Sequence, residues 1–116
     1  MANYEDLDVY RRSYETALRV HKVTEAHGVD DMVRQIRRAT KSIPANIAEG
    51  FSKVNSRAEV KRFIGMALRS CDEVKVWLDF CRDLGYMAGE ECESLKSEYR
   101  EYGAMLYALW RRHDKA

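Results

Sequence analysis

The sequence contains one proline in 116 residues, Pro44, and only six glycines. Few residues therefore interrupt a regular backbone, and no segment shows the alternation of apolar and polar residues that is typical of strands. Apolar residues recur at helical spacing instead, and the chain is long enough for one ordinary core but not for two. We predict an all-α protein, an antiparallel up-down-up-down four-helix bundle that forms a single domain over residues 1–116.

Long apolar runs are also lacking. Charged residues make up 34% of the chain, and the longest uncharged stretches, such as residues 42–48, are too short to cross a bilayer. The first ten residues are acidic and lack the basic start and apolar centre of a secretion signal. We therefore expect a soluble, cytoplasmic protein that does not contact membranes.

Cysteine and histidine are equally scarce, with three of each. Cys71, Cys81 and Cys92 are odd in number and lack CxxC spacing, which argues against a disulfide framework and a zinc site. The chain has no Glu-x-x-His pair, glycine-rich phosphate loop, GxSxG or HExxH motif. We expect no metal, no cofactor and no enzymatic activity.

Glycine, asparagine and capping signals divide the chain into four predicted helices. The first covers residues 5–26 and ends at Gly28, and the second follows Asp30 and ends at Gly50. The third begins at the capping box of Ser56 and Glu59 and runs to residue 84, and the fourth covers residues 88–113.

Each predicted helix has an apolar stripe expected to face the core. On the first helix it comprises Leu7, Tyr10, Tyr14, Ala17, Leu18 and His21. On the second it comprises Met32, Ile36, Ala39, Ile43 and Ile47. On the third it is a heptad seam of Val60, Ile64, Ala67, Cys71, Val74, Leu78 and Cys81. On the fourth it comprises Cys92, Leu95, Tyr99, Tyr102, Leu106, Leu109 and Trp110.

The third helix carries more apolar surface than one core face needs. A second seam beside the first widens its apolar arc to roughly 200°, about twice that of a simple surface helix. Val9, Val20 and Val23 likewise lie off the main stripe of the first helix. This surplus predicts a homo-oligomer, with an interface that includes Phe63, Met66, Trp77 and Phe80.

The net charge is only +1, but the charges are unevenly distributed. Residues 34–62 contain eight basic and two acidic side chains, whereas residues 72–101 contain nine acidic and four basic ones. The basic cluster within residues 34–62 could bind RNA or DNA phosphates without reading the bases. The predicted nucleic-acid-binding residues are Arg34, Arg37, Arg38, Lys41, Lys53, Arg57, Lys61 and Arg62.

Two alternatives remain for the basic cluster. Its side chains could simply be solvated, as most helical charge runs are. The basic and acidic faces could also meet across subunits or dock another protein, in which case the chain would be a protein-interaction module without a nucleic-acid ligand.

Pro44 lies within a segment that otherwise has a helical pattern. A proline inside a helix removes one backbone hydrogen bond and costs ~3 kcal/mol unless neighbouring groups compensate. We predict that Pro44, Asn46, Glu49 and Gly50 form a structural joint that sets the last turn of the second helix.

The segment QIRRATKSIPANIAEG, residues 35–50, resembles the signature of small bacterial four-helix-bundle proteins encoded within intervening sequences of 23S rRNA genes. The resemblance extends to DLDVYRRSYE near the N-terminus and to Gly85 and Tyr86. It also includes Glu59, Phe63, Ala67, Ser70 and Glu73. Arg69 departs from the pattern, which usually has a small residue there.

This resemblance implies a four-helix bundle that assembles into a homo-oligomeric ring, a pentamer, with no established catalysis. The family is distantly similar to accessory proteins of diversity-generating retroelements, which form basic pentameric barrels that bind nucleic acid and a reverse transcriptase. That similarity is at the level of the fold, so it assigns no binding residue in this chain.

Overall fold

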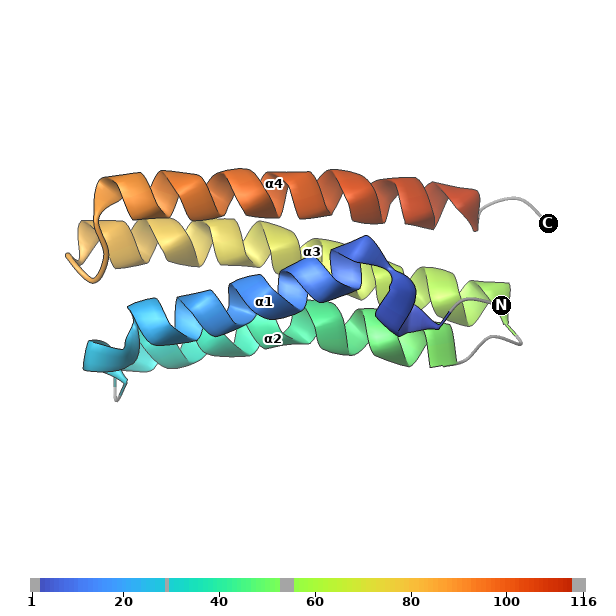
Figure 1. The fold of residues 1–116 in the computed structure, drawn as a ribbon, viewed down its shortest axis with the longest axis horizontal. Helices are drawn as coiled ribbons and strands as arrows, with labels where there is room; N and C mark the ends of the chain where they lie inside the picture. The colour runs from blue at the N-terminus through green and yellow to red at the C-terminus, as the bar shows by residue number, and fades with distance from the viewer. Residues whose placement is uncertain (1–2, 29, 53–55, 114–116) are drawn as a thin grey trace.

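The computed structural model describes residues 3–28, 30–52 and 56–113. Within these ranges the chain forms four α-helices and no strand: α1 (Asp8–Val23), α2 (Asp31–Ser52), α3 (Arg57–Asp83) and α4 (Gly89–Arg112). Two short 3-10 turns, η1 (Tyr4–Asp6) and η2 (Glu25–His27), flank α1. Successive helices run in opposite directions along a molecule of 47 × 21 × 21 Å (Figure 1). The predicted all-α architecture of four helices is confirmed for the described residues.

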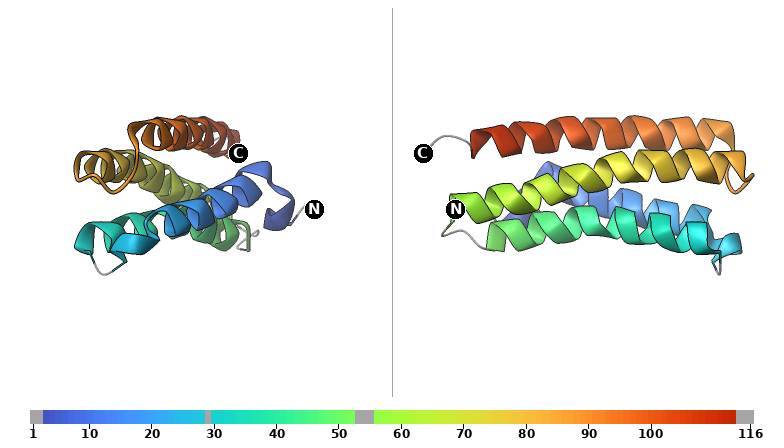
Figure 2. Two further views of the ribbon diagram at one scale, coloured as in Figure 1. Left: turned by 60° about the vertical axis from the view of Figure 1, so that its left-hand side comes forward. Right: turned by 180° about the vertical axis from the view of Figure 1, so that it is seen from behind.

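The helix pairs differ in how extensively they pack. α2 and α3 share the largest contact, and α3–α4 and α1–α2 are intermediate, whereas α1 and α4 touch sparsely. α2 therefore packs between α1 and α3, as the two further views show (Figure 2). The first and last helices close the bundle only weakly.

The heptad seam of α3 is confirmed, because the buried residues of α3 are the seven predicted ones. On α4 the predicted stripe from Cys92 to Leu109 is buried, and only Trp110 remains partly exposed. On α2 the predicted isoleucines are buried, with Val33 in the core in place of Met32, which is partly buried. These helices were readable because apolar residues dominate their core faces, although Thr40 of α2 is also buried.

The predicted core face of α1 is only partly right, because Ala17 is buried and Leu7 and Tyr10 pack against the core, but the other three residues do not. Tyr14 and Leu18 are half exposed and His21 is exposed, whereas Val9 and Val20, which we expected at a subunit interface, are buried in the core. The buried face of α1 also includes the hydroxyl residues Ser13 and Thr16, and a third hydroxyl residue, Thr24, is buried just after the helix ends.

Local hydrogen bonds explain why these hydroxyl residues can be buried. Ser13 Oγ donates to the Tyr10 carbonyl, 3.2 Å away, Thr16 Oγ1 to the Arg12 carbonyl at 2.9 Å, and Thr24 Oγ1 to the Val20 carbonyl at 2.8 Å. A hydroxyl that bonds to the preceding turn can enter a core without an unsatisfied polar group.

Some helices begin or end at residues other than the predicted ones. α1 begins at Asp8 and ends at Val23, and Gly28 follows the η2 turn with an ordinary φ of −59°, so it does not cap α1. Asp30 and Ser56 act as expected: Asp30 Oδ1 accepts from the Met32 amide at 2.7 Å, and Ser56 Oγ from the Glu59 amide at 3.1 Å. Gly50 does not end α2, which continues to Ser52.

The turn between α3 and α4 is tied to the turn between α1 and α2. Gly85 adopts a φ of +78°, and the amide of Tyr86 donates to the Cys81 carbonyl at 2.8 Å, which is the hydrogen bond of a Schellman cap. The Tyr86 hydroxyl then donates to Asp30 Oδ2 at 2.6 Å, and its ring stacks on His27 at 4.2 Å. Both turns are thereby fixed at one end of the bundle.

Candidate nucleic-acid interface

Four of the predicted cations lie together on α2. Arg34, Arg37, Arg38 and Lys41 line an open hollow of about 490 Å³ together with His21, Ser42 and Ala45. The helical period brings these cations to the outer face of α2, opposite its buried isoleucines. The hollow therefore concentrates positive charge between α1 and α2.

The four cations differ in how firmly they are held. Arg37 donates to the His21 carbonyl at 3.0 Å and to Thr24 Oγ1 at 3.3 Å, so it fastens the end of α1 to α2. Arg38 pairs with Glu73 of α3 at 3.0 Å. The cations of this hollow that remain most available to a ligand are Arg34 and Lys41.

Arg34 is exposed, and its ion pair within the described ranges is a long contact of 3.7 Å to Asp31. Lys41 is also exposed, and it has no ion-pair partner among the described residues. Both side chains can reach a phosphate without first breaking a strong internal contact.

The remaining predicted cations lie elsewhere. Lys61 and Arg62 line a separate hollow of about 330 Å³ between α3 and α4, which also contains Arg69 and Trp110. Arg57 is exposed in the first turn of α3, and Lys53 lies outside the described residues. Six of the eight predicted cations are thus divided between two hollows that share no lining residue.

Aromatic rings accompany the cations of this second hollow. Lys61 Nζ lies 4.1 Å from the centroid of the Trp110 ring, and Tyr107 stacks against Trp110 at 6.1 Å. Sequence reasoning assigned Trp110 to the core and missed this cluster. The clue was the position of Trp110 at the basic end of α4, directly before Arg111 and Arg112.

The four residues of the predicted joint all lie within α2. α2 continues as a helix through Pro44, and the Asn46 side-chain amide donates to the Ser42 carbonyl at 2.8 Å. Gly50 is buried where α2 meets α3: a Cβ atom there would lie 2.9 Å from Cβ of Phe63. Glu49 is exposed, and its carbonyl accepts from Ser52 Oγ at 2.8 Å.

An apolar groove of about 310 Å³ lies between α1 and α2, and the sequence did not predict it. Its lining residues are Tyr10, Tyr14, Ala17, Leu18, His21, Lys41, Pro44, Ala45 and Ala48. Pro44 is buried at the side of this groove. The groove shares His21, Lys41 and Ala45 with the basic hollow, so the two depressions are continuous.

The predicted oligomer-interface residues lie on α3 with differing exposure. Phe80 is half exposed, and Phe63, Met66 and Trp77 are partly buried. The Trp77 indole donates to Glu73 Oε2 at 3.2 Å, and its ring lies 5.8 Å from that of Phe80. Val76 and Leu84 are also exposed on this helix and at its end.

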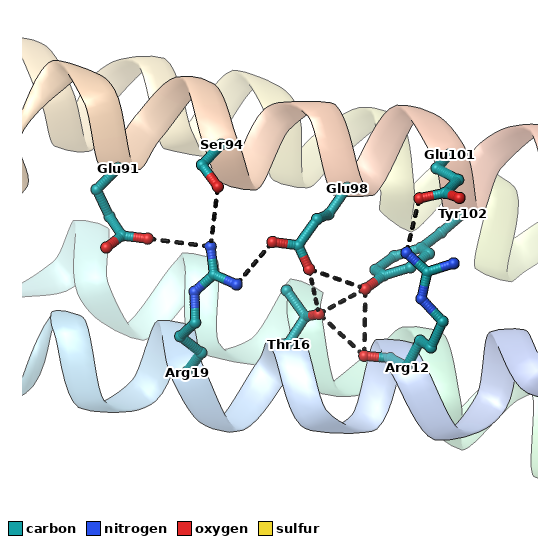
Figure 3. Close-up of polar contacts among 8 residues, drawn as sticks. All are labelled: Arg12, Thr16, Arg19, Glu91, Ser94, Glu98, Glu101 and Tyr102. Atoms are coloured by element: carbon teal, nitrogen blue, oxygen red, sulfur yellow. Dashed lines mark hydrogen bonds and ion pairs between the residues drawn. The ribbon is translucent and has the colours of Figure 1, made fainter.

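A polar network joins α1 to α4 (Figure 3). Thr16 Oγ1 and the Tyr102 hydroxyl each lie 3.1 Å from Glu98 Oε1. Arg19 pairs with Glu98 at 2.6 Å and with Glu91 at 3.1 Å, and Arg12 pairs with Glu101 at 2.6 Å. The members of this network are bonded to one another, so we assign it a structural role at the weakest helix contact.

The cysteines lie in the core, where thiols are poor nucleophiles. Burial raises the pKa of Cys71 to about 12 and that of Cys81 to about 11, and it also raises the pKa of Cys92. No group of three or more potential metal-ligating side chains occurs in the described part of the chain. Over the same part, none of the helices combines the length and apolar character needed to span a bilayer.

Comparisons with known proteins agree with this fold. A protein of unknown function from the S23 ribosomal protein family of Bacteroides thetaiotaomicron VPI-5482, whose crystal structure was determined at 1.70 Å, has a TM-score of 0.81 and 27% sequence identity. The match covers 89% of this chain and 95% of that one. No curated protein matches the sequence. The profile of the 23S rRNA-intervening sequence proteins matches residues 5–108, and the chain belongs to this family.

Proposed function

We propose that this protein is a non-enzymatic, self-associating bundle that binds RNA or DNA phosphates through the basic hollow on α2. The observation that carries this proposal is the gathering of Arg34, Arg37, Arg38 and Lys41 around one depression. Cations that converge on a hollow attract phosphates through charge and do not require a particular base sequence.

The different contacts and exposure of these four cations support the proposal. Arg37 and Arg38 are positioned by contacts to α1 and α3, so they form a fixed base for the hollow. Arg34 and Lys41 extend from that base with exposed side chains. Lys61, Arg62 and Arg69 form a second basic surface that a longer nucleic acid would reach, with Trp110 available for contact with a base.

The non-enzymatic part of the proposal rests on the chemistry of the available side chains. The thiols are buried with raised pKa values, and the polar network of α1 and α4 has its hydroxyls and carboxylates engaged with one another. We further propose that the chain forms a ring, for which the family resemblance implies a pentamer, and that it acts in the cytoplasm.

Salt-dependent binding tests the proposed function. Fluorescent single-stranded RNA and DNA should bind at ~50 mM salt and lose affinity with a log–log slope of about −3 if four cations contact phosphates. The double variant Arg34→Glu/Lys41→Glu should weaken binding about tenfold or more. Arg100→Glu, which reverses an exposed cation on α4, serves as the matched control and should retain most of the affinity. Absence of binding at ~50 mM salt would contradict the proposal.

A second candidate function is a protein-interaction module without a nucleic-acid ligand. The apolar groove between α1 and α2 favours it, because exposed apolar depressions are more typical of protein contacts than of phosphate contacts. Under this alternative, the wild type would bind no nucleic acid. Arg34→Glu/Lys41→Glu would instead change the mass of the assembly.

A further inference from the structure

The groove between α1 and α2 changes in character along its length. Most of its lining is apolar, and Tyr14 and Leu18 are half exposed in it. Its described lining contains no carboxylate, and its two side chains that can carry positive charge are His21 and Lys41. Because α1 and α2 run in opposite directions, His21 and Lys41 lie at the same end, where the groove joins the basic hollow (Figure 1).

The opposite end of the groove, at Tyr10, has acidic neighbours. The η1 turn packs against both α1 and α2 there, and the ring of Tyr4 meets that of Tyr10 edge-on, with centroids 4.9 Å apart. This turn carries Glu5 and Asp6. The two ends of the groove therefore differ in charge, and an anionic group is favoured at Lys41 and disfavoured at Tyr10.

The dimensions of the groove fit a single extended chain. Its volume is about 310 Å³, within the range of small-ligand sites. Tyr10 and His21 are eleven residues apart on the helix, which corresponds to about 16 Å along its axis. A long groove of small volume accommodates one slender hydrocarbon chain better than a compact ring system.

The chemistry of the lining also favours a hydrocarbon chain. Leu18, Pro44 and Ala48 have no side-chain group that can form a hydrogen bond, so a nucleobase buried against them would leave its polar edge without partners. An alkyl chain has no polar group to satisfy, and its burial contributes about 0.8 kcal/mol per methylene.

We propose that the α1–α2 groove binds a single-chain amphipathic anion, with its hydrocarbon chain between the two helices and its carboxylate or phosphate head group at Lys41. Lys41 is exposed and has no ion-pair partner among the described residues, so it can receive the head group directly. The site shares Lys41 with the proposed nucleic-acid surface but does not depend on that function.

Methyl NMR of the full chain titrated with dodecanoate tests the site, at concentrations at which the probe forms no micelles. The methyl signals of Ala17, Leu18 and Ala48 should shift, whereas those of the core residues Ala39 and Ala67 should not. Dodecyl phosphate distinguishes a phosphate head group from a carboxylate. Dodecyltrimethylammonium, which carries the opposite charge, should bind at least about threefold more weakly than the anions.

Chain length tests the placement of the hydrocarbon. Decanoate has two methylenes fewer than dodecanoate and should bind about tenfold more weakly, because each buried methylene contributes to affinity. Equal affinities would mean that the head group alone is bound, which would overturn the proposal.

Substitutions in the groove provide an independent test. Ala48→Phe fills the groove near its Tyr10 end and should abolish dodecanoate binding, whereas Ala104→Phe, at an exposed position of α4, is the matched control. Lys41→Gln should weaken binding about threefold, and Lys22→Gln, which removes an exposed cation outside the groove, should not. Circular dichroism verifies folding, and if Ala48→Phe misfolds, Leu18→Glu replaces it by placing a repelling carboxylate in the groove.

Several outcomes would overturn the inference. Absence of methyl shifts at ~1 mM dodecanoate would exclude a useful affinity. Shifts that include Ala39 and Ala67 would mean that the chain enters an opened core, and equal binding of the cationic probe would exclude a role for the basic end. If dodecanoate does not bind and Ala48→Phe instead changes the mass of the assembly, the groove is a protein contact.

Nucleic-acid binding is measured separately on the same variants. Ala48→Phe keeps Arg34 and Lys41, so its affinity for RNA should equal that of the wild type. Failure of the amphiphile site and failure of the proposed nucleic-acid function are thereby seen in different measurements.

Discussion

Thr16 Oγ1 lies 2.6 Å from the hydroxyl oxygen of Tyr102, a hydrogen bond between residues 86 apart in the sequence. It joins α1 to α4, which touch only sparsely, and both side chains are buried.

Tyr102→Phe should therefore destabilise the fold. Removing the hydroxyl leaves Thr16 and Glu98 each without one buried partner, which should lower the free energy of unfolding by about 1–2 kcal/mol. Urea denaturation measures the change, and Tyr107→Phe, at an exposed position of the same helix, should change it by less than about 0.5 kcal/mol. Combining Tyr102→Phe with Thr16→Val should cost less than the sum of the two single changes.

Gly50→Ala should weaken the contact between α2 and α3. The added Cβ would lie 2.9 Å from Cβ of Phe63, so the helices must separate, at a cost of about 1–3 kcal/mol. Gly103→Ala is the matched control within α4, where a Cβ meets nothing within 4 Å. That change should raise stability by about 0.5–1 kcal/mol through helix propensity. Equal effects of the two substitutions would argue against the close approach.

Substitutions of Arg37 and Arg34 should show that stability and nucleic-acid binding depend on different cations of the basic hollow. Arg37→Ala removes donors to the His21 carbonyl and to Thr24, and should lower the free energy of unfolding by about 1–2 kcal/mol. Arg34→Ala removes an exposed side chain with one long ion pair and should change it by less than about 0.5 kcal/mol. Under the proposed function Arg34→Ala should nevertheless weaken RNA binding, a combination that a purely structural role for Arg34 would not produce.

Acid should destabilise the bundle through three hydrogen-bonded carboxylates. The Tyr86 hydroxyl lowers the pKa of Asp30, Lys96 lowers that of Asp79, and Arg12 lowers that of Glu101. A lowered folded-state pKa gives stability that is fully present above the ordinary values of 3.8 and 4.5 and is lost as pH falls through the folded-state values.

The melting temperature should thus be nearly constant from about pH 7 to 5 as far as these groups are concerned, and fall below about pH 4.5. Glu101→Gln removes one of the three groups and should make the fall less steep. A fall of the same steepness in this variant would exclude a contribution from the Arg12–Glu101 pair.

The sequence predicted α3 best because its core positions are apolar without exception. Val60 to Cys81 repeat at heptad spacing, and the buried set matches that repeat. Asp30 and Ser56 were equally readable, since a short polar side chain before a helix has a direct local role. Local chemistry and helical period therefore account for most of the bundle.

The face of α1 could not be read in this way. Its core side includes Ser13 and Thr16, whose hydroxyls bond within their own helix, and its outer side includes the apolar Tyr14 and Leu18. An apolar count therefore assigns Tyr14 and Leu18 to the core and leaves out Ser13 and Thr16. The predicted nucleic-acid-binding cations do not line a single hollow. Lys41 and Lys61 lie in one basic stretch of the sequence, but the packing of the helices places them in different hollows.

The polar network between α1 and α4 also determines how the folded bundle opens. When α1 leaves α4, water can replace the contacts of Arg12, Arg19 and Glu98, and few other contacts between these two helices are lost. Separating α2 from α3 would break far more contacts. We therefore expect deuterium to enter the backbone amides of α1, whose helix can fray once its contacts to α4 open, well before those of α3.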